Sequence, residues 1–171
     1  KLVTSADDYD LVQVYGWESR VSLVHTWTQV GRPSDALDGV LDPTFDPAQT
    51  ASVERDPGIP ATPDAVPGSA RYREVTPEDV RITVETAAPA LVVVRNSYDE
   101  GWSATVDGQP APLLATDYLV QGVAVPGGRH EIRLVYRDDD VMRGALAGIV
   151  VWVLLLTSIP AALLLERRAR R

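Results

Sequence analysis

The 171-residue sequence contains no cysteine and two histidines. Without cysteine the chain forms no disulfide and performs no thiolate chemistry, so its hydrophobic core must hold the fold. His25 and His130 have no second ligand at a useful spacing, whereas a tetrahedral zinc site needs three or four donors. The sequence therefore predicts neither a metal site nor a bound cofactor.

Several common catalytic motifs are also missing. The sequence has no G-x-S-x-G, and Gly127-Gly128 lacks the following helix and lysine of a phosphate-binding loop. The acids of residues 42–47 (DPTFDP) lack the alternation and the glycine of a calcium loop, and a turn is the better interpretation. No catalytic residue is predicted in this chain.

Basic residues are scarce except at the C-terminus. The net charge is −8, and the last six residues, ERRARR, hold four arginines and one glutamate, so the rest of the chain carries −11. Such an acidic body repels phosphate groups. A nucleic-acid partner is therefore not expected.

One long hydrophobic run stands before this basic end. Residues 144–165 (GALAGIVVWVLLLTSIPAALLL) give about 22 consecutive uncharged residues, enough to cross a bilayer core of roughly 30 Å. We therefore predict a transmembrane helix at residues 141–165, with the lipid bilayer as a partner. Basic residues beside a span stay in the cytoplasm, which predicts a cytoplasmic tail at residues 166–171 and an extracytoplasmic domain at residues 1–140 of a cell-membrane protein.

The start of the sequence bears on the same expectation. Residue 1 is lysine, and no charged-then-apolar leader precedes the domain. We expect the chain to be the end of a longer protein, whose remaining transmembrane helices would be partners of this one.

The body of the chain has the pattern of a mainly β domain. One short helix is predicted at residues 34–41, with Ser34 as N-cap, and a proline-rich loop at residues 56–68. Clean alternation marks DVRITVE, whereas LVVVRN is nearly all apolar and predicts a central strand buried on both faces. We expect an antiparallel, jelly-roll-like β-sandwich, with strands at residues 21–30, 50–54, 72–75, 79–85, 90–97, 102–106, 118–125 and 130–136.

Residues 96–110 (NSYDEGWSATVDGQP) combine rings, acids and glycines. Asp107-Gly108 favours a two-residue type I′ hairpin, and we interpret Asp107 as a turn former rather than a catalytic acid. Gly127-Gly128 predicts a second such hairpin.

Four residues in and near this stretch are candidate glycan contacts: Tyr98, Asp99, Trp102 and Tyr118. Aromatic rings can stack on a sugar face while carboxylates accept hydrogen bonds from its hydroxyls. In the alternative interpretation, Trp102 begins a strand and closes one end of the sandwich.

A longer pattern points to a family. G-W-x-A-x-V-D-G-x-x-A is followed by a tyrosine-bearing strand, V-P-x-G-x-H and a closing strand that ends in tyrosine before the apolar run. Over roughly residues 15 to 165 the chain resembles the C-terminal extracytoplasmic module of the YfhO family of bacterial polytopic membrane proteins, which are similar to C-type glycosyltransferases. It departs from that family at Asp99 and Glu100, where an aromatic residue and a proline are common.

The resemblance implies a function for the whole protein. It predicts a glycosyltransferase-like membrane protein of cell-envelope glycan or lipid-linked sugar metabolism that uses polyprenyl-phosphate sugars. The family's catalytic acids lie in an early loop outside this chain, so we expect a non-catalytic accessory region whose partners include a glycan or lipid-linked sugar. Two alternatives remain: an ectodomain that caps the membrane bundle or docks a partner without binding sugar, and a tail-anchored adhesive ectodomain.

Overall fold

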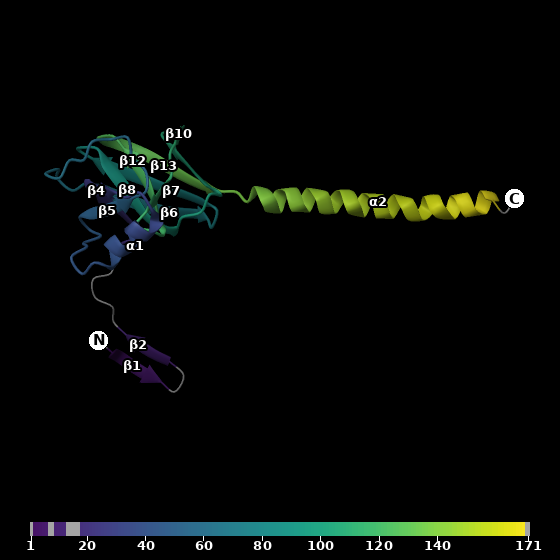
Figure 1. The fold of residues 1–171 in the computed structure, drawn as a ribbon, viewed down its shortest axis with the longest axis horizontal. Helices are drawn as coiled ribbons and strands as arrows, with labels where there is room; N and C mark the ends of the chain where they lie inside the picture. Colours follow the sequence, from purple (N-terminus) through teal and green to yellow (C-terminus); the bar gives the residue numbers. More distant parts are fainter. Residues whose placement is uncertain (1, 7–8, 13–17, 170–171) are drawn as a thin grey trace. The chain divides into compact units, whose positions relative to one another are not determined.

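A computed structural model describes residues 2–6, 9–12 and 18–169, and the chain divides into two compact units, Lys1–Tyr136 and Arg137–Arg171 (Figure 1). The first unit holds the strands and a short helix, and the second holds a long helix. The elements are β1 (Leu2–Ala6), β2 (Tyr9–Val12), β3 (Val21–Val24), β4 (Thr26–Gln29), α1 (Pro33–Leu41), β5 (Thr50–Val53), β6 (Ser69–Thr76), β7 (Asp79–Thr86), β8 (Ala90–Ser97), β9 (Trp102–Val106), β10 (Gln109–Ala111), β11 (Leu114–Thr116), β12 (Val120–Val125), β13 (Gly128–Tyr136) and α2 (Asp139–Ala169).

Two large sheets share one hydrophobic core. The five-stranded sheet has the order β10-β9-β13-β7-β6, and the six-stranded sheet has the order β3-β8-β12-β11-β5-β4; β1 and β2 form a separate hairpin. Ile82 and Ile132 of the first sheet and Val92 and Val123 of the second belong to the same buried cluster. The predicted mainly β class with one short helix in the domain is confirmed.

The six-stranded sheet is curled. His25 alone separates β3 from β4, yet these strands lie at opposite edges of the sheet, so the two edges must come together at this residue. A second buried cluster, which includes Val24, Val53, Leu91 and Leu114, fills the concave side. Strand β8 therefore contributes to both clusters through alternate residues, as its apolar run predicted.

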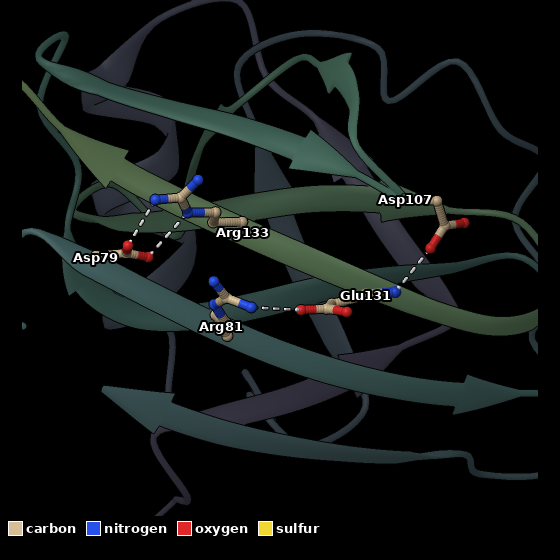
Figure 2. Close-up of polar contacts among 5 residues, drawn as sticks. All are labelled: Asp79, Arg81, Asp107, Glu131 and Arg133. Atoms are coloured by element: carbon tan, nitrogen blue, oxygen red, sulfur yellow. Dashed lines mark hydrogen bonds and ion pairs between the residues drawn. The ribbon is translucent and has the colours of Figure 1, made fainter. Parts of the chain in front are cut away.

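The five-stranded sheet has one buried face and one polar face. Strand β7 alternates strictly between buried and exposed residues along most of its length, as predicted. On its polar face Arg133 forms a two-bond ion pair with Asp79, at 2.7 and 3.1 Å, and Arg81 lies 3.4 Å from Glu131 (Figure 2). One face of this sheet therefore packs against the core, and the other contacts solvent.

Two strand predictions need correction. Residues 21–30 do not form one strand, because the chain leaves one sheet edge and joins the other at His25, where the ring Nδ1 lies 2.9 Å from the carbonyl oxygen of Pro89. The pairing is not wholly antiparallel either, since β4 runs parallel to β5. In addition, β1, β2 and β11 are short strands that were not predicted, and β12 begins at Val120 rather than at Tyr118.

The two predicted glycine turns differ. Asp107 and Gly108 have φ values of 51° and 80° and join β9 to β10, so this hairpin is confirmed. Gly127-Gly128 is not a hairpin, because β12 and β13 belong to different sheets and the chain crosses between them here. A Cβ on Gly127 would lie 2.8 Å from the carbonyl oxygen of Ala87, so glycine is required by the close approach of two chain segments.

The predicted helix is confirmed at Pro33–Leu41, but its cap is not. The N-cap is Arg32, whose side chain makes no capping bond, and Pro33 occupies the first turn, where its missing N–H has no cost. Ser34 instead lies inside the helix, 3.4 Å from a carboxylate oxygen of Asp35. Residues 56–68 contain neither helix nor strand, as their prolines predicted.

The second unit contains α2, a helix of 31 residues that includes the whole apolar run 144–165. No candidate membrane span is found among the residues that the structure describes, and the side chains of residues 159–169 lie outside them. Residues 170–171 of the predicted basic tail lie outside the described residues.

Candidate functional site

A hollow of about 440 Å³ opens at one end of the shared core, where β8 ends and β9 begins. Strands β6, β8 and β9 supply most of its walls, and the segments before β3 and β7 supply the rest. Its lining residues are Arg20, Tyr72, Glu74, Pro77, Arg95, Asn96, Ser97 and Trp102.

Two aromatic rings give the hollow an apolar surface. Trp102 is half-buried, packs against the shared core and lies 5.4 Å from the ring of Tyr136. Tyr72 is also half-buried against this core, and the guanidinium of Arg20 lies over its ring at 5.3 Å. Because the core fixes both rings from behind, they form rigid walls with little entropy left to lose on binding.

A short polar network crosses the hollow. Arg20 donates from Nε to Oδ1 of Asn96 at 2.9 Å, and the Asn96 amide nitrogen lies 3.4 Å from the Tyr72 hydroxyl. Among the described residues, the terminal nitrogens of Arg20 and the carboxylate of Glu74 have no hydrogen-bond partner. The hollow therefore offers both donors and an acceptor to a ligand.

Arg95 lines the same hollow but has a different role. Its guanidinium donates to the Ser19 carbonyl oxygen at 2.8 Å and to the Ser22 hydroxyl at 2.9 Å, and it lies 3.8 Å from Glu18. These contacts tie the segment before β3 to β8. Arg95 thus positions Arg20 at the rim rather than presenting free donors itself.

The structure brings one of the four predicted candidates into the hollow. Trp102 lines it, whereas Tyr98, Asp99 and Tyr118 do not. Asp99 forms a turn: its Oδ1 accepts from the Gly101 N–H at 2.8 Å, and its carbonyl oxygen accepts from the Trp102 N–H at 3.1 Å.

The two tyrosines lie in neighbouring backbone segments. Tyr98 is half-buried and donates its N–H to the Leu119 carbonyl oxygen at 2.7 Å. Tyr118 is 37% exposed and has a φ of 70°, next to Asp117 at 47°, so it belongs to a tight turn. These residues do not converge with Trp102 on one ligand-sized space among the described hollows.

Asp107 is a structural residue, as expected for a turn former. Its carboxylate accepts the Glu131 N–H at 2.8 Å and lies 2.6 Å from Nδ1 of His130. The Glu131 N–H and His130 hold the pKa of Asp107 below its ordinary value. In a catalytic histidine–aspartate pair the second ring nitrogen contacts a nucleophile, but Nε2 of His130 is buried with no partner among the described residues.

The residues that line the hollow do not favour hydrolytic chemistry. Glycoside hydrolysis needs a pair of carboxyl groups across the bond that is cleaved, and Glu74 supplies one carboxylate. No cluster of three or more metal-binding side chains occurs among the residues that the structure describes. Rigid rings beside donors and an acceptor suit binding of a polyhydroxylated ligand rather than its conversion.

Comparison with known proteins adds no assignment. No family model, no curated protein and no solved structure matches the chain. The interpretation of the hollow therefore depends on its geometry.

Proposed function

We propose that this chain is the C-terminal sandwich-type extracytoplasmic module and last transmembrane helix of a YfhO-like, glycosyltransferase-like membrane protein, and that the module binds a glycan or lipid-linked sugar. The module itself is non-catalytic and holds its ligand near an active site that other parts of the protein supply. The observation that carries the binding proposal is the hollow in which Trp102 and Tyr72 lie beside Arg20, Asn96 and Glu74.

The chemistry of these groups favours a sugar. A pyranose has apolar C–H faces that pack on an aromatic ring, and its hydroxyls both donate and accept hydrogen bonds. Trp102 supplies the ring, the guanidinium of Arg20 donates, and the carboxylate of Glu74 accepts. The volume, about 440 Å³, lies within the range of small-molecule sites.

The membrane part of the proposal is supported by the composition of α2. Its described apolar side chains are 51–66% exposed from Leu146 to Leu156, with apolar residues on every side of the helix. A helix that is apolar all round needs an apolar environment. We propose that α2 crosses the cell membrane, with the domain outside and residues 166–171 in the cytoplasm.

A binding titration tests the sugar proposal. The full chain would be kept in a polyoxyethylene detergent, whose headgroup contains no sugar, and titrated with cell-wall glycans and polyprenyl-phosphate sugars while tryptophan fluorescence is followed. We expect a saturable change that Trp102→Ala abolishes. Arg20→Gln should weaken binding about tenfold without lowering the melting temperature, because it removes a charged hydrogen-bond donor at an exposed position.

Tyr118→Ala is the matched control, because Tyr118 is an exposed aromatic residue that does not line the hollow. Binding unaffected by Tyr118→Ala but lost in Trp102→Ala would locate the ligand. Equal loss in both variants, or no response to any glycan, would contradict the proposal.

The structural alternative is supported by a specific contact. Trp102 packs against Tyr136 and the shared core, so it also closes one end of the domain. If this is its whole role, Trp102→Ala lowers the melting temperature and Arg20→Gln changes nothing that can be measured. The two variants together therefore separate the sugar-binding module from a capping or docking ectodomain.

A further inference from the structure

The polar face of the five-stranded sheet carries an unusual number of arginines. They project from β6, β7 and β13, and all are exposed; we call this surface the arginine face, defined by Arg71, Arg73, Arg81, Arg129 and Arg133. The same face carries three acids, Asp79, Glu85 and Glu131. It therefore has an excess of positive charge, whereas the chain as a whole has a net charge of −8.

The register of the strands places like charges next to one another. Arg73 lies directly opposite Arg81, and Arg81 lies directly opposite Arg133. Like charges at opposed positions of neighbouring strands destabilise a sheet. Cross-strand pairing within the fold therefore does not explain why three arginines share one row.

Two of these charges are neutralised and three are not. Arg133 pairs with Asp79, and Arg81 with Glu131, as Figure 2 shows. Within the described part of the chain, Arg71, Arg73 and Arg129 have neither an ion pair nor a side-chain hydrogen bond. Three guanidinium groups are available to a ligand.

Protection of a sheet edge explains part of this pattern. Strand β6 is an edge strand, and charged residues on an edge prevent pairing with other chains. That role accounts for Arg71 and Arg73. It does not account for Arg129, which lies on the interior strand β13 and has no ion pair within the described part of the chain.

Two adjoining hollows lie on the arginine face, with volumes of about 220 and 260 Å³. They share Arg71 and Thr83, and each contains at least two arginines, one hydroxyl-bearing residue and one glutamate. The first adds Arg73, Arg81 and Glu131; the second adds Ser69, Glu85 and Arg129.

The glutamates decide which kind of anion fits. A phosphate group presents only acceptor oxygens at its charged end, so it offers no hydrogen-bond donor to the carboxylates of Glu131 and Glu85. A sugar that carries a carboxylate offers an anion to the arginine forks and hydroxyl donors to the glutamates. Two equivalent hollows in succession suit a chain of such units.

We propose that the arginine face binds a linear acidic polysaccharide whose sugar units carry carboxylates, and that both hollows contact it. The guanidinium groups of Arg71, Arg73 and Arg129 hold the carboxylates, and Glu131 and Glu85 accept hydroxyl hydrogen bonds. This surface uses none of the residues of the Trp102 hollow, so the proposal does not depend on the function assigned to that hollow.

Isothermal titration calorimetry of the full chain in polyoxyethylene detergent tests the proposal. The probe is a galacturonic acid oligomer, compared with the neutral galactose oligomer of the same length and with inorganic polyphosphate. We expect saturable binding of the acidic oligomer that weakens as salt is added, no binding of the neutral oligomer, and weaker binding of polyphosphate.

The double variant Arg71→Gln, Arg73→Gln should reduce the affinity for the acidic oligomer at least tenfold. It removes no ion pair of the described fold, so its melting temperature should not fall. The control is Arg32→Gln with Arg55→Gln, which makes the same change in net charge away from the arginine face, removes the exposed Arg32–Asp35 ion pair as well, and should leave the affinity unchanged.

Four results would overturn the proposal: no binding of the acidic oligomer, an equal loss in both double variants, equal binding of the neutral oligomer, or tighter binding of polyphosphate. The last would identify a general anion surface instead. Trp102→Ala should leave this affinity unchanged, so the outcome here is separate from the outcome for the Trp102 hollow.

Discussion

The two large sheets of the domain differ in how many of their faces are buried. The six-stranded sheet is buried on both sides, one against the shared core and one inside its own curl, whereas the five-stranded sheet buries one side and exposes the arginine face. The difference appears in the sequences of β8 and β7, of which one is nearly continuous in apolar residues and the other alternates. The second face of the six-stranded sheet therefore adds to the buried core, whereas that of the five-stranded sheet remains a free polar surface.

The largest expected effect is in the curled sheet. Leu91 is fully buried in its concave cluster, so Leu91→Ala should lower the free energy of unfolding by about 2–5 kcal/mol. The control is Thr83→Ala, on the exposed side of β7, which should change it by less than about 0.5 kcal/mol. Thermal unfolding followed by circular dichroism measures both, and similar effects would break the contrast between the sheets.

A glycine in the same sheet gives the next largest effect. A Cβ on Gly122 would collide with the side chain of Thr116 and lie 3.2 Å from that of Leu91. Gly122→Val should therefore lower the free energy of unfolding by about 1–3 kcal/mol. A Cβ added to Gly39 in α1 would have no atom within 4 Å. Gly39→Ala should therefore raise the free energy of unfolding by about 0.5–1 kcal/mol. Melting temperatures that shift in the same direction would contradict this account.

Two aspartates in turns allow the two sheets to be compared through the pH dependence of their stability. Burial raises the pKa of Asp117, in the six-stranded sheet, although Ser52 donates to it at 2.7 Å; the Glu131 N–H and His130 lower the pKa of Asp107, in the five-stranded sheet. At neutral pH, Asp117→Asn should thus raise the melting temperature and Asp107→Asn should lower it. Asparagine tolerates the positive φ at both positions.

The difference in melting temperature between each variant and the unmodified chain should disappear in acid. Ionised Asp107 stabilises the fold above the ordinary carboxyl pKa of about 4, and this contribution is lost as the pH falls through its lowered pKa. Ionised Asp117 destabilises the fold above its raised pKa, and this penalty is lost below about pH 4. Melting curves from pH 7 to pH 3 would show whether the two variants converge on the unmodified chain from opposite sides.

Local patterns in the sequence predicted most strands but not how the chain moves between sheets. The bounds of β8 and β9 and the Asp107-Gly108 turn depend on neighbouring residues, and they agree with expectation. The break at His25 depends on its contact with Pro89, far along the chain, and the crossing at Gly127-Gly128 depends on which sheet receives β13. No local periodicity contains that information.

The candidate site was predictable to the same extent. The sequence indicates Trp102, because it is a ring where a loop joins two strands, and Trp102 lines the hollow. Arg20, Tyr72 and Asn96 were not identified, because three separate strands or strand ends bring them together. Tyr72 had one usable signal, since the alternation of β6 places it on the inner face with Ala70.

The position of β13 has a consequence for how the domain folds. This strand lies between β7 and β9 in the five-stranded sheet, yet it is the last strand of the chain and ends just before α2. During synthesis the sheet therefore lacks its middle strand until Tyr136 has left the ribosome, and β3 must wait for a partner, β8, about 70 residues away. Folding of the domain is completed only as the apolar helix is being made, and until then the core surfaces of both sheets stay exposed to aggregation.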